Sequence, residues 1–294
     1  MSQNDEQDFV NIKIWNLFRN RFKSSVTEAS YWSDITEFCR FTGKQFDTAG
    51  RKDVERYYRM MGKKVEEGKI SPLTLTKKFR VLHSFASFLT EEGYASGEDY
   101  FYPYLKHLKK EDRLAKSIPV EHMDALLSAA SENLMCYAIL SLMYRAGLSS
   151  TEISGLNGPD DFILQGSDVY VILSGREESC FIPEDVWEIL KEYMDQREEH
   201  PSLFYNRSGR RLNTMYISRM MKKYCRLAGI PAYSAEAVRN SCAFNLFAYG
   251  ASSGQTAAQM GTTQQQIRRY KGAGYRDNLR KQANALVKVR IEKP

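Results

Sequence analysis

The chain has 294 residues, of which 43% are hydrophobic, enough for two domains of ordinary size that each bury a core. Its formal net charge is +6, and its apolar runs are far shorter than the roughly 18 residues that a membrane span requires. The first residues, MSQNDEQDF, are acidic and polar, whereas a signal peptide is first basic and then apolar. Composition therefore excludes fibrous, disordered and membrane-spanning classes, and it predicts a cytoplasmic protein.

Apolar residues at three- and four-residue spacing predict four helices in the first hundred residues. They cover about 9–23, 28–41, 51–67 and 73–93; Ser71-Pro72 announces the fourth, and Gly93 is its stop signal. The charged stretch LKHLKKEDRLAKSIP comes next, and its polarity and final proline are typical of an exposed connector. We therefore expect a helical N-terminal domain with its linker at 1–115 and a second domain at 116–294.

The second domain is predicted to be mainly helical with one small antiparallel β-sheet. Two segments with β-branched, alternating character flank a polar turn and predict a short hairpin over 168–173 and 179–183. The helical segments lie at 120–130, 133–144, 184–200, 214–230 and 237–250, with a short one that ends at Tyr270.

The cysteines of the chain are scattered, with no CxxC spacing. This pattern predicts neither a disulfide framework nor a structural zinc site. We expect reduced, mostly buried thiols at Cys39, Cys136, Cys180, Cys225 and Cys242.

Basic residues are concentrated at the C-terminus. From Arg268 onward there are nine basic residues against Asp277 and Glu292, a surplus of seven, so the rest of the chain is close to neutral. Such a tail suits a polyanion such as DNA. A solvated basic tail without a ligand is the alternative.

Five local segments resemble the phage integrase family of tyrosine recombinases, and they occur in the family's order. MYRAGLSSTEISGL is similar to the T-G-L-R-x-S-E-L box, and LFYNRSGRRLN and YCRLAGI are similar to the segments that follow the sheet. AVRNSCAFNLFAYGAS resembles the H-x-x-R box, and AAQMGTTQQQIRRY occupies the place of the last box with the tyrosine. The resemblance covers roughly residues 10–275. It implies a Xer-like architecture, with a SAM-like helical core-binding domain before an integrase-type catalytic domain.

The resemblance implies transesterification at a DNA phosphate. A tyrosine hydroxyl attacks the phosphorus and forms a phosphotyrosyl link. Two arginines bind the phosphate oxygens, because a guanidinium pairs with them bidentately and keeps its charge. A lysine and two imidazoles assist proton transfer. No metal or other cofactor is implied.

Two positions of the catalytic set keep the family's residue type. Tyr270 falls where the nucleophile stands, and Arg239 falls at the arginine of the H-x-x-R box. Tyr270 has a rival interpretation as a structural aromatic residue. Arg239 is either a phosphate ligand or an ion-pair partner of Glu152 or Glu236.

The other positions are substituted. Ser149 stands at the first arginine, Glu236 and Thr262 stand at the two histidines, and the hairpin turn has Arg176 as the nearest cation in place of the lysine. The chain's four histidines lie outside these boxes. Arg145, one helical turn before Ser149, is a further candidate to supply the missing guanidinium.

Clusters of basic residues predict where DNA phosphates bind. A solvated surface is the alternative for each cluster. The candidates are Lys77, Lys78, Arg80, Arg210, Arg211, Lys222, Lys223, Arg268 and Arg269.

Three functions remain open. The first is a DNA-binding family member with weak or no strand-exchange activity, because losing one preorganised donor slows such a reaction roughly a hundred- to a thousandfold. It would bind double-stranded DNA, associate with itself or with an active recombinase, and serve recombination or integration as an accessory subunit. The second is an active recombinase that uses Tyr270. The third is a protein-interaction module of a recombination complex.

Overall fold

The chain folds as two units, Met1–Glu111 and Asp112–Pro294. The computed structural model describes residues 10–22, 24–95, 98–108 and 115–270. The boundary between the units lies a few residues before the end of the linker predicted from the sequence. No helix in the described residues is both long and apolar enough to cross a membrane.

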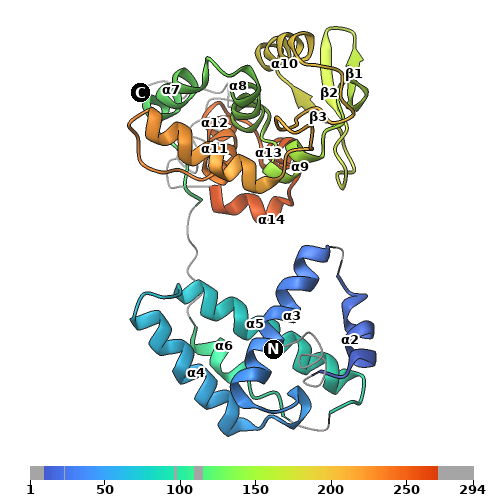
Figure 1. Ribbon diagram of the computed structural model, residues 1–294, viewed down its shortest axis with the longest axis vertical. Coiled ribbons are helices and arrows are strands. Elements are labelled where there is room, and N and C mark those ends of the chain that lie inside the picture. The colour runs from blue at the N-terminus through green and yellow to red at the C-terminus, as the bar shows by residue number, and fades with distance from the viewer. Residues whose placement is uncertain (1–9, 23, 96–97, 109–114, 271–294) are drawn as a thin grey trace, which may run out of the picture. The chain divides into compact units, whose positions relative to one another are not determined.

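The N-terminal unit is built from helices around an aromatic core (Figure 1). Four of them match the predicted segments, with ends that differ by a few residues: α2 Ile12–Arg19, α3 Ser25–Thr42, α4 Arg51–Glu66 and α5 Pro72–Glu91. A further helix, α6 Tyr102–His107, was not predicted, because six residues are too few to show helical periodicity. The start of α5 follows from its sequence: Ser71 caps the helix by accepting a hydrogen bond from the Thr74 amide, and Pro72 stands in the first turn.

The second unit is mainly helical, as predicted. It begins with α7 Val120–Ala130 and α8 Leu134–Ser141, and α8 continues into a π-helical turn, Leu142–Ala146. The remaining helices are α9 Ser150–Gly155, α10 Glu184–Gln196, α11 Thr214–Leu227, α12 Ala235–Ala248, α13 Ser253–Met260 and α14 Gln264–Ile267, followed by a 3-10 turn, Arg268–Tyr270.

The sheet has three antiparallel strands in the order β1-β2-β3. The predicted hairpin corresponds to β2 Asp168–Val171 and β3 Cys180–Ile182, and β1 Phe162–Gln165 was missed. The reason is that β1 reads FILQ, which lacks the apolar–polar alternation that marks a half-buried strand. Phe162 pairs with Val171, and Val171 pairs with Cys180, so these buried residues share the face that covers the core.

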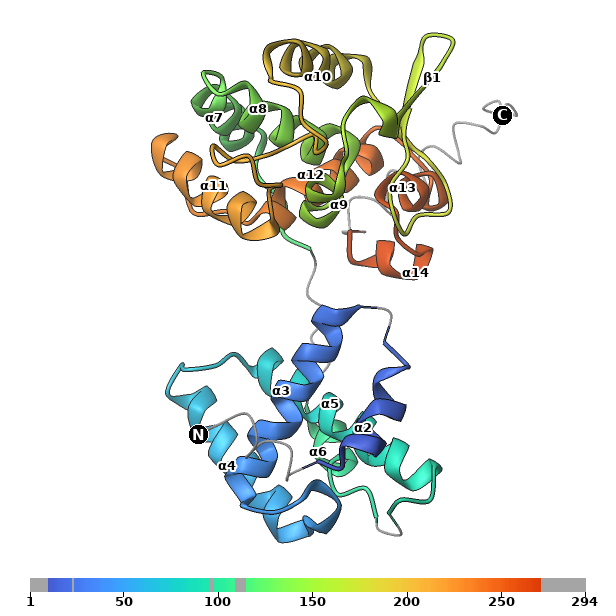
Figure 2. The same ribbon diagram turned by 45° about the vertical axis from the view of Figure 1, so that its right-hand side comes forward.

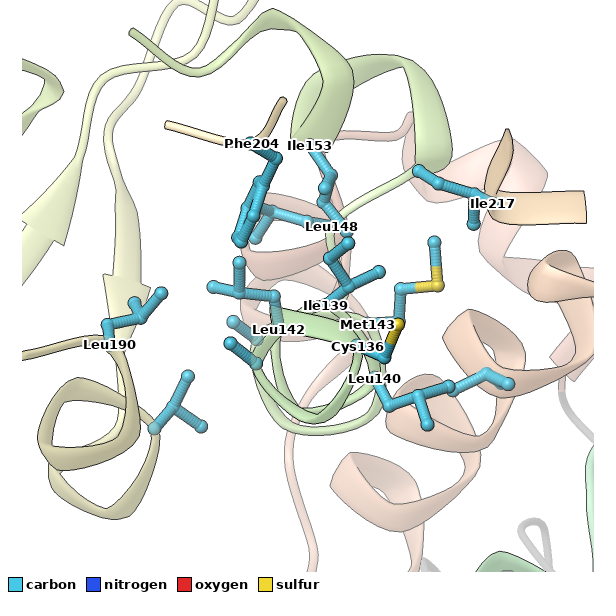
Figure 3. Packing of buried hydrophobic residues seen from close by; sticks show 14 of the residues in the cluster. Cys136, Ile139, Leu140, Leu142, Met143, Leu148, Ile153, Leu190, Phe204 and Ile217 are labelled. Atoms are coloured by element: carbon cyan, nitrogen blue, oxygen red, sulfur yellow. The ribbon is translucent and has the colours of Figure 1, made fainter. Parts of the chain in front are cut away.

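Helix α8 is the centre of the main core. It is apolar almost all round, which is typical of a helix enclosed by others. Figure 3 shows Ile139 and Leu142 surrounded by side chains from other elements, among them Ile153, Leu190 and Phe204. This core fixes the π-helical turn and Gly147, from which the candidate site is built.

A smaller cluster joins the C-terminal elements. Helices α12 and α13 pack against each other (Figure 2), and α13 also contacts β3. Buried residues of α12, α13, α14 and the last turn form this cluster: Cys242, Ala243, Phe247, Ala257, Met260, Ile267 and Tyr270.

The cysteine prediction concerns residues that the structure describes in full. All five cysteine side chains are buried. The prediction of buried thiols is therefore confirmed. Among the described residues, no group of three or more His, Cys, Asp or Glu side chains is placed to hold a metal ion.

Candidate functional site

Gly147 makes the turn on which the site is built. It ends the π-helical turn in the left-handed conformation, with φ of 73°. A Cβ at this position would lie 2.6 Å from Met260 Sδ and 3.3 Å from Cys242 Sγ, so only glycine fits. The turn therefore brings the π-helical segment directly against α12 and α13.

Arg239 holds this turn to α13. Its Nε donates to the Gly147 carbonyl at 2.8 Å, and its Nη2 donates to the Met260 carbonyl. Within the described residues no ion pair joins Arg239 to Glu152 or to Glu236, so the ion-pair interpretation was wrong. The guanidinium is partly buried and connects two backbone segments.

Ser149, which the sequence resemblance places at the family's first arginine, caps a helix. Its hydroxyl accepts from the Glu152 amide, and the Glu152 carboxylate accepts from the Ser149 amide at 2.6 Å, a capping box that starts α9. The position is therefore occupied by a helix start and supplies no cation.

Arg176 reaches from the hairpin turn into the same region and pairs with Glu152. The Nε–Oε1 distance is 2.6 Å, and the two side chains are 6% and 15% exposed. Nη1 of Arg176 donates to the Gln259 carbonyl at 2.8 Å. Burial would raise the pKa of Glu152, but the hydrogen bonds from Arg176 and from the Ser149 amide lower it overall.

Two polar atoms of this region have no hydrogen-bond partner. They are Nη2 of Arg176 and Oγ1 of Thr262, both buried. Both residues line a pocket of 510 Å³, with Gly175, Glu178 and Gln266 among the other lining residues. An unpaired guanidinium nitrogen beside a hydroxyl can donate two hydrogen bonds to an anion, although the carboxylates of the turn oppose one.

Tyr270 is buried at the end of the 3-10 turn, with 1% of its surface exposed. Its hydroxyl donates to Asn240 Oδ1 at 3.0 Å and accepts from Arg269 Nη2 at 2.6 Å. The Phe244 ring meets the Tyr270 ring edge to face at 5.8 Å. The hydroxyl is therefore held inside the protein in this state.

Glu236, which stands at the histidine position of the H-x-x-R box, does not line the pocket of Arg176 and Thr262. Glu236 is exposed and forms an ion pair with Arg269 at 3.3 Å. Arg269 is thus shared between the carboxylate and the Tyr270 hydroxyl. Arg145 pairs with Asp185 of α10 at 2.8 Å, which directs its guanidinium to α10 and leaves the position of the first arginine without a cation.

The cations of the N-terminal unit differ in how free they are. On α5, Lys77 and Arg80 are exposed, with Lys77 Nζ donating to a serine hydroxyl at 3.1 Å. Lys78 is only 14% exposed and pairs with Asp34 at 2.6 Å and Glu37 at 2.5 Å. These two carboxylates neutralise the Lys78 ammonium, so Lys78 belongs to an ion-pair network inside the N-terminal unit and is not a free cation for DNA.

The cations of the second unit divide in the same way. Arg211 donates to the Ser154 and Leu156 carbonyls at 3.1 and 3.0 Å, so it closes the C-terminal end of α9. Arg210 and Arg268 are exposed. On α11, Lys222 and Lys223 lie with Arg219 and Arg226 on one exposed basic face, which a three- and four-residue spacing creates. The basic residues from Lys271 onward lie outside the described residues.

Sequence reasoning missed two polar side chains that organise the site. Asn240, directly after Arg239, is bonded to the Tyr270 hydroxyl. Gln259, directly before Met260, donates through Nε2 to the Ala146 and Phe181 carbonyls at 3.0 and 2.9 Å. The signal available in the sequence was their position beside residues of the two boxes, because a neutral amide is otherwise no mark of a site.

Comparison with known proteins shows the family. The sequence model of the Phage integrase family matches residues 116–271, which is more than half of the chain. The chain therefore belongs to the phage integrase family.

Curated relatives are tyrosine recombinases. A tyrosine recombinase of Thermosipho africanus is 28% identical over 218 residues, covering 71% of this chain and 75% of the relative. Tyrosine recombinase XerC of Listeria welshimeri is 26% identical over 236 residues, covering 75% and 74%. Among solved structures, the Tn1549 transposon integrase in complex with circular intermediate DNA superposes with a TM-score of 0.70 at 15% identity, covering 92% of this chain and 98% of that one. The structural match shows the fold.

Proposed function

We propose that this protein binds double-stranded DNA through both of its units and has weak or no strand-exchange activity of its own, so that it acts in DNA recombination or integration as an accessory or regulatory subunit. Family membership and the DNA-bound relative with the same fold support DNA as the partner. Exposed cations on each unit supply candidate phosphate contacts: Lys77, Arg80, Arg210, Lys222, Lys223 and Arg268.

One observation carries the proposal of weak activity: protein acceptors already occupy the groups that would bind and attack the phosphate. Arg239 is bound by two backbone carbonyls, Arg176 by Glu152 and a backbone carbonyl, and the Tyr270 hydroxyl by Asn240. Removing one preorganised donor costs about 3 to 4 kcal/mol in the transition state. With three family donors replaced, a rate loss on the order of ten thousandfold or more follows, even if their effects are not additive.

A suicide-substrate assay tests activity directly. Nicked duplexes from the protein's own genomic flanks are incubated with the wild type and with Tyr270→Phe, and the products are separated on native and denaturing gels. We expect a retarded native complex for both proteins and no covalent band. A covalent protein–DNA band that Tyr270→Phe abolishes would overturn the proposal of an inactive protein.

DNA binding itself is tested by charge removal on α5. The double variant Lys77→Ala/Arg80→Ala is compared with Lys63→Ala, a single exposed lysine of α4. Removing two cations that neutralise phosphates lowers affinity and also flattens the dependence of log K on log salt, by about 0.9 for each phosphate that is no longer neutralised. Equal affinities and salt slopes for the double variant and the wild type would remove α5 from the interface. Absent or salt-insensitive binding by the wild type would favour the protein-interaction module.

The second candidate is an active recombinase, which the free Nη2 of Arg176 favours. In that reaction the Tyr270 hydroxyl loses its proton and its oxygen forms a bond to phosphorus, while the bond from phosphorus to a deoxyribose oxygen breaks. The leaving oxygen takes up one proton, so the step consumes no net proton. Arg176 and Arg239 would carry the phosphate charge. Under this candidate the covalent band appears with the wild type, and Arg176→Gln abolishes it.

A further inference from the structure

The last residues of the linker are bonded to the segment that carries Tyr270. The Ala115 amide donates to the Arg269 carbonyl at 3.0 Å, and the Ala115 side chain packs against the cluster that contains Tyr270. Further on, the buried Ile118 amide donates to Ser241 Oγ of α12 at 2.9 Å. Residues 115–118, which we call the strap, therefore lie along α12 and reach the residue directly before the tyrosine.

Asn240 joins the strap to the tyrosine hydroxyl. Its Nδ2 donates to the Lys116 carbonyl at 3.0 Å, while its Oδ1 accepts from the Tyr270 hydroxyl at 3.0 Å. The residue is 5% exposed, so both bonds lie away from solvent, where an unpaired donor or acceptor is unfavourable. An amide side chain donates at one end and accepts at the other, and for that reason Asn240 can link the two segments.

Arg269 makes the second link. Its backbone carbonyl accepts from the strap at Ala115, and its side chain donates to the Tyr270 hydroxyl at 2.6 Å with the guanidinium carbon 4.9 Å from the centre of the tyrosine ring. Glu236 holds the same guanidinium from outside at 3.3 Å. Both are exposed, at 42% and 63%, so a phosphate that reached this surface could replace Glu236 as the partner of Arg269.

We propose that Asn240 and Arg269 are positioning residues for Tyr270 and that they couple the tyrosine to the strap. The hydroxyl keeps its buried place only while the strap keeps its hydrogen bonds to α12 and to Arg269. Movement of the linker releases the tyrosine, and release of the tyrosine loosens the strap. The coupling itself does not depend on DNA binding. Only its biological purpose rests on the proposed function, because the linker connects the strap to the unit whose cations are proposed to contact DNA.

The coupling is tested by nitration of tyrosine with tetranitromethane, with each site read by peptide mass spectrometry on the full chain. Ser241→Ala removes the acceptor of the Ile118 amide without touching Tyr270. We expect about fivefold faster nitration of Tyr270, the effect of one ordinary hydrogen bond on a local opening equilibrium. Two tyrosines of the same unit serve as references. Tyr249 is 92% exposed and gives the nitration rate of an accessible ring, and Tyr224 is 4% exposed and gives the rate of a buried one.

The matched control is Ser154→Ala. Ser154 Oγ donates to the carbonyl four residues earlier, as Ser241 Oγ does to Ala237, but it binds no strap amide. Unchanged Tyr270 nitration in Ser154→Ala, with Tyr224 protected in both variants, supports the coupling. Equal Tyr270 rates in Ser241→Ala and Ser154→Ala overturn it.

The reverse direction provides a second measurement, because coupling between two sites is reciprocal. Tyr270→Phe removes the hydroxyl that Asn240 and Arg269 bind, and it is expected to speed deuterium exchange of the Ala115 and Ile118 amides about fivefold. Exchange equal to wild type at both amides would overturn the coupling. This measurement does not need Ser241→Ala, so it still applies if that variant fails to fold. A wild type that binds no duplex in a gel shift would reject the proposed function and leave the coupling standing.

Discussion

The ion pair between Glu152 and Arg176 gives the sharpest prediction about stability. The change Glu152→Gln keeps the size but removes the charge that compensates a guanidinium only 6% exposed, and its NH2 group must face a donor, either Arg176 Nε or the Ser149 amide. Breaking a buried pair by removing one partner costs about 3 to 5 kcal/mol, so the expected loss is at least about 3 kcal/mol. The double variant Glu152→Gln/Arg176→Gln is expected to recover part of this loss, because it no longer leaves a buried charge unpaired.

The loss should depend on pH in a defined direction. The pKa of Glu152 is lowered in the folded protein from its ordinary value of 4.5. A carboxylate with a lowered pKa stabilises the fold above the unfolded pKa, and this contribution is lost as the pH falls through the folded pKa. The difference between wild type and Glu152→Gln is therefore largest near neutral pH and shrinks below about pH 4.5.

Urea unfolding of the full chain measures this difference. Labelling of the Cys180 thiol reports the second unit and labelling of Cys39 reports the N-terminal unit, so the two transitions are separated. A loss of about 3 kcal/mol shifts the Cys180 midpoint by roughly 1 to 2 M urea, while the Cys39 midpoint stays unchanged. The control is Glu177→Gln, the same change at an exposed position of the hairpin turn, which is expected to stay within about 0.5 kcal/mol. Equal Cys180 midpoints for the two variants would refute the reasoning.

Three further predictions follow from single contacts. Arg145→Ala removes a pair in which both side chains are about half exposed, so we expect a loss below about 1 kcal/mol that vanishes in high salt; a larger, salt-independent loss in urea unfolding would contradict this. Gly147→Ala combines a left-handed backbone with a clash against Met260 Sδ, and a loss of about 2 kcal/mol or more is expected in the same assay, whereas a neutral effect would show that the turn relaxes freely. Burial raises the pKa of the Cys180 thiol to about 11 and that of Cys242 to about 12, so neither reacts with Ellman's reagent at pH 8 until the unit unfolds; rapid native labelling of either would contradict the burial.

Much of the fold was predictable because its signals are local. Helices such as α5 and α11 carry apolar residues at three- and four-residue spacing over several turns, together with caps, and both appear where the sequence places them. The missed elements are short: α6 and α9 have six residues each, α13 has eight and β1 has four. Short segments of this kind have no periodicity to detect.

The sequence alone determined which catalytic residue types are missing. Ser149, Glu236 and Thr262 are read directly from the boxes, and no folding can return an imidazole or a guanidinium to those positions. The family followed from the same boxes, because their order along the chain is itself sequence information.

Only the tertiary structure decided which cations remain free and where the tyrosine hydroxyl lies. Lys78 is neutralised by Asp34, 44 residues away in the chain, and the Tyr270 hydroxyl is bound by Asn240, 30 residues away. The strap amides find their acceptors at an even greater separation: Ile118 and Ser241 are 123 residues apart. An ion pair or a buried hydrogen bond depends on distances of about 3 Å between groups that the chain brings together only when it folds, so no local pattern records them.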